Sequence, residues 1–184
     1  MTAGIFSDLD GTLIFSQRLL DAGRDITLVE RLNGKPQAWM SNKAWESVER
    51  ARRFAHLVPV TTRTREQYER IRLPGGRAEY VILSNGARIL RDGIEDRGWS
   101  EAIDDPSWSV TGPTDITALL ERHVGAEPWV REIAHHDNIA CVITHRGEVA
   151  PDWFAPLAID IASDHGYTAY PQGRKTHLIP DRKS

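Results

Sequence analysis

Short apolar runs alternate with amphipathic stretches along the first 90 residues of the chain. The runs are short enough to be strands buried in a sheet, and they lie at 3–7, 57–60 and 80–83. Between them, Ser41 is a suitable N-cap for an amphipathic helix that reaches Ala55, and residues 66–71 predict a second helix. Strands that alternate with helices favour a parallel sheet whose connections are crossover helices.

One hairpin interrupts this alternation. The segment 26–32 predicts a strand, and Asn33-Gly34 after it is a strong signal for a two-residue turn. Pro36 restricts the returning strand to the edge of a sheet, because proline has no N–H to donate. Two interpretations stay open for this hairpin: an ordinary surface hairpin, or a flap beside a functional site.

The pattern changes after about residue 91. A segment rich in Asp, Pro and Trp, 99–113, predicts a loop, and the remainder reads as helix, strand, strand, helix, strand, strand. These elements are expected at 114–123, 129–134, 139–145, 152–163, 167–170 and 176–179. The order is typical of an α+β unit, so we expect a second domain that begins near residue 91.

Composition narrows the class of protein. The net charge is −3 and the pI is about 6.2, values that give no indication of a nucleic-acid or anionic-membrane surface. No apolar run approaches the roughly 20 residues needed to span a bilayer, and the N-terminus lacks the basic start of a signal peptide. The single cysteine, Cys141, cannot form an internal disulfide, so we expect a reducing, cytoplasmic location.

Small polar residues follow each of the three short strands. They are Asp8 and Asp10 after the first, Thr61, Thr62 and Arg63 after the second, and Ser84, Asn85 and Gly86 after the third. In an open α/β sheet, these carboxyl ends share the edge where ligands bind. Asp8 and Asp10 are two residues apart, so on an extended segment they face the same side. Such a pair can hold Mg²⁺ and leave one carboxylate free to act as a nucleophile; a simple Asx-type turn is the structural alternative.

The segment Asp8-Leu9-Asp10-Gly11-Thr12 resembles the first motif of the haloacid dehalogenase (HAD) superfamily of phosphohydrolases. Val60-Thr61-Thr62-Arg63 is similar to the second motif. Ser84-Asn85-Gly86-Ala87 is similar to a segment of the branch whose cap follows the second motif, which includes the sucrose-phosphate phosphatases and Cof-type sugar phosphatases. The resemblance implies an α/β fold: a Rossmann-like parallel core with an inserted α+β cap. The expected domains are the first part of the core at 1–90, the cap at 91–171 and a return segment to the core at 172–184.

The resemblance also implies roles for single residues. Asp8 would be the nucleophile that forms an aspartyl-phosphate, and Asp10 the acid that protonates the leaving oxygen and later deprotonates water. Mg²⁺ would lie between Asp8 and the backbone carbonyl of Asp10. The candidate phosphate contacts are Thr61, Thr62, Arg63 and Asn85. A solvated arginine remains the alternative for Arg63, and a left-handed turn the alternative for Asn85.

Two motifs of the family have no good match. Counted from Pro180, the family's lysine would fall one position past the end of the chain, and Lys183 is the nearest candidate. A Gly-Asp motif that completes the Mg²⁺ shell is not evident, because Asp160 and Asp164 lie on a predicted cap helix. Without the strand that carries it, the core would have an open edge. Three explanations stay open: a longer native chain, which we favour, a partner chain that completes the core, or a degenerate protein.

We therefore predict a Mg²⁺-dependent phosphomonoester hydrolase that acts on a small phosphorylated metabolite such as a sugar phosphate. Trp99 or Trp108 could stack on a sugar ring. The alternatives are a non-catalytic module that binds a phospho-ligand or a partner chain, and a phosphomutase, which would give an isomerised phosphosugar. His135-His136-Asp137 is a weaker candidate for zinc, because adjacent histidines on a strand face opposite ways.

Overall fold

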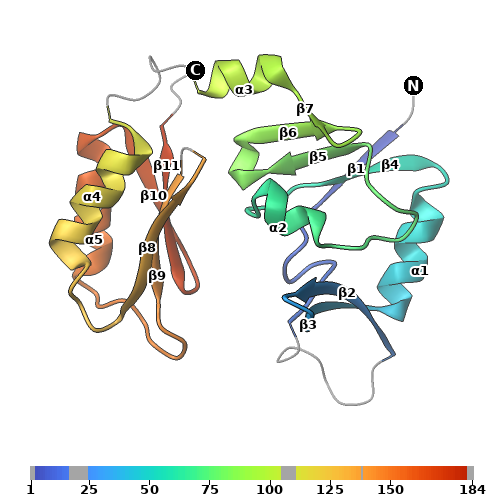
Figure 1. The fold of residues 1–184 in the computed structure, drawn as a ribbon, viewed down its shortest axis with the longest axis horizontal. Helices are drawn as coiled ribbons and strands as arrows, with labels where there is room; N and C mark the ends of the chain where they lie inside the picture. Colours follow the sequence, from blue (N-terminus) through green and yellow to red (C-terminus); the bar gives the residue numbers. More distant parts are fainter. Residues whose placement is uncertain (1–2, 17–24, 105–110, 138, 182–184) are drawn as a thin grey trace. The chain divides into compact units, whose positions relative to one another are not determined.

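The computed structural model describes residues 3–16, 25–104, 111–137 and 139–181 (Figure 1). The chain divides into two compact units, Met1–Ser100 and Glu101–Ser184. The division falls later than the boundary predicted near residue 91. The segment after that boundary still belongs to the first unit, because Asp96 N donates a hydrogen bond to Ile89 O (2.9 Å).

Parallel strands form the centre of the first unit. β1 (Ala3–Ser7) pairs with β4 (Ala55–Pro59) in parallel, in a register that runs from Ala3 opposite Ala55 to Ser7 opposite Pro59. A parallel bridge between Val60 and Ile82 then attaches β5 (Tyr80–Leu83) beside the end of β4. These contacts confirm the predicted parallel arrangement of the three short strands. β5 continues into an antiparallel meander that the pattern did not predict, formed with β6 (Arg88–Arg91) and β7 (Ile94–Glu95).

Three helices connect or follow these strands. α1 (Asn42–Ala51) begins at Ser41, whose hydroxyl accepts a hydrogen bond from Ala44 N (3.1 Å), as predicted. The helix ends at Ala51, short of the predicted Ala55, which begins β4 instead. α2 (Arg65–Glu69) starts with a capping box between Thr64 and Gln67. α3 (Arg97–Ile103) occupies the start of the segment predicted to be a loop, which is a correction.

The predicted hairpin is present as β2 (Ile26–Leu32) and β3 (Lys35–Ser41). Asn33 and Gly34 form its turn with φ of 50° and 76°, the positive values that a type I′ turn requires. The hairpin is attached to the segment after β1, because Phe15 and Trp39 exchange two backbone hydrogen bonds of 2.8 and 2.9 Å. It therefore lies beside the chain segment that carries Asp8 and Asp10.

The core of the first unit begins after β1, not within it. Its fully buried members are Leu9, Ile14, Met40 and Leu83, and Leu57, Tyr68, Val81 and Leu90 pack with them. The side chains of Ile5 and Phe6 are instead 41% and 68% exposed, so the prediction that 3–7 is a buried strand is wrong in that respect. The strand exists, but in the described residues β4 is its only partner.

The second unit is a four-stranded antiparallel sheet packed against two helices (Figure 1). Its elements are α4 (Pro113–Val124), β8 (Val130–His136), β9 (Ile139–Thr144), α5 (Phe154–Asp164), β10 (Tyr167–Gln172) and β11 (Lys175–Pro180). The core combines Leu120 of α4, Phe154 of α5 and Leu178 of β11. This is the predicted order of helices and strands. No helix in the described part of the chain has the length and apolar character to cross a bilayer.

The return segment predicted at 172–184 is corrected by the same sheet. β11 lies between β9 and β10, so Lys175–Pro180 is an inner strand of the second unit. The reason is the burial of Leu178, which is fully enclosed in the core of that unit.

The cap of α1 gives a first test. Ser41→Ala should lower the free energy of unfolding by about 1 kcal/mol, because the N–H of Ala44 loses its acceptor. Ser47→Ala in the same helix is the matched control, since its exposed hydroxyl only donates back to Lys43 O and alanine favours the helix. Urea unfolding measures both, and equal losses in the two variants would contradict the capping role.

Candidate functional site

Backbone hydrogen bonds bring three polar loops together at the carboxyl ends of β1, β4 and β5. The links are Val60 N to Ser7 O (2.8 Å), Thr61 N to Ile82 O (2.9 Å), Ser84 N to Arg63 O (3.0 Å) and Asn85 N to Thr61 O (3.3 Å). The loops that follow the strands are therefore direct neighbours. The candidate residues predicted on the three loops lie at one edge, where an open α/β sheet places its ligands.

The first loop carries Asp8 and Asp10 on either side of the fully buried Leu9, and both acids are exposed. Leu9 N donates to Asp8 Oδ1 at 2.7 Å, which orients this carboxylate. The backbone carbonyl of Leu9 accepts hydrogen bonds from three successive N–H groups, those of Thr12, Leu13 and Ile14. Gly11, with φ of 83°, allows the tight turn. The buried leucine thus anchors the loop and leaves the two carboxylates facing water.

The second loop places a buried hydroxyl and an arginine side by side. Thr61 is 4% exposed, and its Oγ1 accepts a hydrogen bond from Arg63 N at 3.2 Å. Thr62 between them is partly exposed. The Arg63 side chain is largely buried, which corrects the alternative that it is a solvated surface arginine.

Arg63 joins two carboxylates. Its Nε and Nη2 donate to the two oxygens of Asp10 at 2.6 and 2.8 Å, a bidentate pair. Its Nη1 donates to Glu30 Oε2 at 2.9 Å, and the other oxygen of Glu30 accepts from Arg70 Nε at 3.2 Å. Four charged side chains therefore form a connected row: Asp10, Arg63, Glu30 and Arg70.

The row keeps Arg63 charged despite its burial. Burial by itself lowers the pKa of the Arg63 guanidinium, but the hydrogen bonds and negative charges of Asp10 and Glu30 outweigh it, so that its pKa is raised. The arginine is a fixed positive charge at every pH of interest.

Glu30 was not among the residues predicted for the site. It lies in β2, and its side chain is almost fully enclosed in the protein. A signal was present in the sequence: in the run Ile26–Leu32 the acid follows directly after apolar residues, where a strand face would otherwise continue. Only the irregular pairing of β2 shows that the acid points inward, which no local pattern predicts.

The third loop has an unusual backbone. Ser84, Asn85 and Gly86 have φ of 49°, 55° and 90°, three successive residues in the left-handed region. Asn85 does adopt the left-handed turn considered for it, and its side chain is exposed at the same edge. Trp99 Nε1 donates to Gly86 O at 2.8 Å, so this tryptophan is held beside the loop. Lys183 and Trp108, both named as candidates from the sequence, lie outside the described residues.

The chemistry offered here is that of oxygen donors and positive charge. Among the described residues, no group of three or more His, Cys, Asp or Glu side chains is arranged to hold a metal. The carboxylate of Asp8 and the backbone carbonyl of Asp10 are nevertheless the hard oxygen donors that Mg²⁺ prefers. Mg²⁺ commonly takes one or two carboxylates and completes its shell with water and substrate phosphate. The donor set fits such an ion.

The chain resembles known proteins in its fold and not in its sequence. No protein-family model and no curated protein sequence matches the chain. Among solved structures, the sucrose-phosphatase of Synechocystis in complex with sucrose and phosphate matches with a TM-score of 0.52, at 14% identity, over 76% of this chain and 56% of that one. A trehalose-6-phosphate phosphatase related protein matches with a TM-score of 0.57, at 18% identity, over 97% and 68%.

The IMP-nucleotidase of Plasmodium falciparum matches with a TM-score of 0.55, at 10% identity, over 97% of this chain and 52% of that one. The chain therefore shares its fold with a sucrose-phosphatase, a trehalose-6-phosphate phosphatase related protein and an IMP-nucleotidase. The chain spans only about half the length of the sucrose-phosphatase and of the nucleotidase.

The members of the charged row differ in exposure, so removing Glu30 should cost more stability than removing Asp10. Glu30→Ala should lower the free energy of unfolding by about 3–5 kcal/mol, because it leaves Arg63 and Arg70 without their shared buried acceptor. Asp10→Ala removes the other partner of Arg63, but this side chain is 52% exposed, so water replaces it at a cost of about 1 kcal/mol or less. Urea unfolding compares the two, and similar losses would contradict the ranking.

Proposed function

We propose that the protein hydrolyses phosphomonoesters through a phosphorylated Asp8. The observation that carries the proposal is the convergence of the Asp8 loop, the Thr61–Arg63 loop and the Asn85 loop at one edge of a parallel sheet. The fold shared with capped HAD phosphatases supports the same chemistry, and the matching motif residues stand at the strand ends where that chemistry needs them.

The first step transfers the phosphoryl group to the protein. A carboxylate oxygen of Asp8 forms a bond to phosphorus as the bond between phosphorus and the ester oxygen breaks. Asp10 enters this step with a proton on an oxygen lone pair that Arg63 does not occupy. It gives this proton to the departing oxygen, so that an alcohol leaves and not an alkoxide. The hydrogen bond from Leu9 N to Asp8 Oδ1 orients the attacking carboxylate. The Thr61 hydroxyl, buried beside Arg63, is the group that we assign to the transferred phosphoryl oxygens.

The second step restores Asp8. Asp10, now a carboxylate, takes a proton from a water molecule whose oxygen attacks phosphorus. The bond between phosphorus and Asp8 then breaks, inorganic phosphate leaves, and the proton remains on Asp10 for the next cycle. Asp8 and the Asp10 carbonyl would hold Mg²⁺, which when bound offsets the negative charge of the phosphoryl group.

We infer that the substrate is a small phosphorylated metabolite, with a sugar phosphate as the first candidate. Trp99 supports this choice, because it is held beside the third loop by Gly86 and remains 40% exposed, as a ring that stacks on a sugar requires. The sucrose-phosphatase among the structural neighbours was solved with sucrose and phosphate. We assign the second unit, with its α+β order, as the cap that selects the substrate.

A non-catalytic module that binds a phospho-ligand is the second candidate. It is favoured by the engagement of both Asp10 oxygens with Arg63, an arrangement that also stabilises a loop without any chemistry. Titration with beryllofluoride, a mimic of the phosphoryl group, in the presence of Mg²⁺ separates the two. Saturable uptake that Asp8→Asn abolishes supports the nucleophile, and absence of uptake supports the binding module.

Asp8→Asn should abolish the release of phosphate from a sugar phosphate, because an amide cannot displace the ester oxygen. The side chain is exposed, so the fold and the midpoint of urea unfolding should stay unchanged. Malachite-green detection of phosphate, followed for wild type and variant at equal concentration with Mg²⁺, measures the effect. Turnover retained by the purified variant would overturn the assignment of the nucleophile.

A further inference from the structure

Glu30 is a buried carboxylate with two arginine partners. It is 2% exposed, and each of its oxygens accepts a hydrogen bond from a different arginine, Arg63 at 2.9 Å and Arg70 at 3.2 Å. An ionised carboxylate at this depth is costly unless it is fully paired. The described structure supplies that pairing from two separate segments of the chain, one of which also carries the candidate site.

An irregularity of β2 turns this side chain inward. In a regular strand, neighbouring side chains face opposite sides, so Val29 and Glu30 could not both enter the same interior. Both are buried here, at 1% and 2% exposed, and the pairing of β2 with β3 shifts register on each side of Glu30. Bulges of this kind re-aim a side chain and occur often beside active sites. The backbone is therefore arranged to deliver one carboxylate to Arg63.

Glu30 and Asp10 hold opposite edges of one planar group. The Arg63 guanidinium gives Nη1 to Glu30 and gives Nε and Nη2 to Asp10, so three of its donors are committed to two carboxylates. With both edges held, the guanidinium cannot rotate, and the plane of the Asp10 carboxylate that pairs with it is set as well. Asp10 is half exposed, and in the described part of the chain the hydrogen bonds to its carboxylate come from Arg63.

We propose that Glu30 is a positioning residue for Asp10: it fixes Arg63, and Arg63 fixes the carboxylate that transfers the proton. The inference rests on the proposed function only for the identity of that proton transfer. That Glu30 immobilises Arg63 is inferred from the hydrogen bond between them and does not depend on the proposed function.

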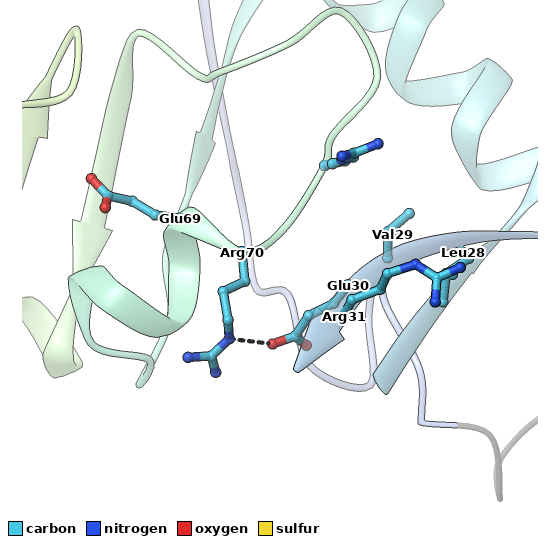
Figure 2. A pocket seen from close by; sticks show the side chains of 7 residues that line it. Leu28, Val29, Glu30, Arg31, Glu69 and Arg70 are labelled. Atoms are coloured by element: carbon cyan, nitrogen blue, oxygen red, sulfur yellow. Dashed lines mark hydrogen bonds and ion pairs between the residues drawn. The ribbon is translucent and has the colours of Figure 1, made fainter. Parts of the chain in front are cut away.

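A cavity of about 470 Å³ borders Glu30 on the other side, and Figure 2 shows Arg70 reaching from there to the Glu30 carboxylate. Arg31, Arg70 and Arg72 contribute to its lining. From this side Arg70 pairs with the Glu30 oxygen that Arg63 does not contact. Arg70 is thus the second counter-ion of the row and has no contact with Asp10 in this structure.

The test compares two esters that differ in their need for a proton. The leaving group of an alkyl phosphate is a poor one, an alkoxide, which needs the proton of Asp10, whereas p-nitrophenolate leaves without protonation. Glu30→Gln, which keeps the size of the side chain but removes its charge, should lower kcat about tenfold for the alkyl ester and about twofold or less for p-nitrophenyl phosphate. Asp10→Asn, which removes the proton donor itself, shows how far the losses of kcat on the two esters can differ. Glu69→Gln is the matched control, since Glu69 borders the same cavity but, among the described residues, forms its ion pair with Arg65.

A second readout needs no turnover. In wild type and in Glu69→Gln, the Nε–H proton of Arg63 should exchange slowly with water in NMR spectra, and in Glu30→Gln it should exchange faster. Equal losses of kcat on both esters, or an Arg63 proton that exchanges alike in all three proteins, would overturn the positioning role. If the wild type hydrolyses neither ester, the proposed function fails, and the exchange of the Arg63 proton still decides whether Glu30 holds Arg63.

Discussion

The parallel pairing of β1 with β4, extended to β5 by a single bridge, is the constraint on which the candidate site depends. Parallel strands present their carboxyl ends at one edge, and the hydrogen bonds that continue past those ends tie the following loops to one another. Asp8, Thr61 and Asn85 are far apart in the sequence. They become neighbours because backbone groups, and not their own side chains, hold the loops together.

Ion pairs then orient the side chains on the loops that the backbone holds together. Arg63 brings a positive charge to the exposed Asp10, and Glu30 secures that arginine from inside the protein. A buried carboxylate is a poor source of stability on its own, because its desolvation cost offsets most of the attraction. The presence of Glu30 in β2 is better explained by its role in orienting Arg63. The hairpin that the sequence left open as a surface feature or a flap is thus connected to the site through one side chain.

Several elements could be predicted from local signals because local physics decides them. Strand β5, the turn at Asn33-Gly34 and the cap at Ser41 follow from apolar runs, left-handed turn residues and a hydroxyl acceptor. The proximity of the loops after β1, β4 and β5 could also be predicted, since the carboxyl ends of parallel strands lie at one edge of the sheet. The motif residues Asp8, Asp10 and Thr61 were named from their resemblance to the motifs of a known family.

Other features depend on partners distant in the sequence and could not be predicted in this way. The side chains of Ile5 and Phe6 are apolar but exposed, because burial requires neighbours that a run of residues does not specify. The pattern predicted the strand at 176–179, but the resemblance assigned 172–184 to the core, and that assignment failed because Leu178 packs in the second unit. Glu30 was missed because the direction of its side chain depends on a register shift in the hairpin. Its place directly after apolar residues in the strand is a signal, but that signal does not tell which way the side chain points.

The most direct measurement is the identity of the residue that carries the phosphoryl group. Quenching the protein during turnover of a phosphomonoester and reducing it with borohydride converts a phosphorylated aspartate to homoserine, which peptide mass spectrometry locates. We expect homoserine at position 8 and at no other acid. Homoserine at a different position, or an intact Asp8 in a protein that is hydrolysing its substrate, would contradict it.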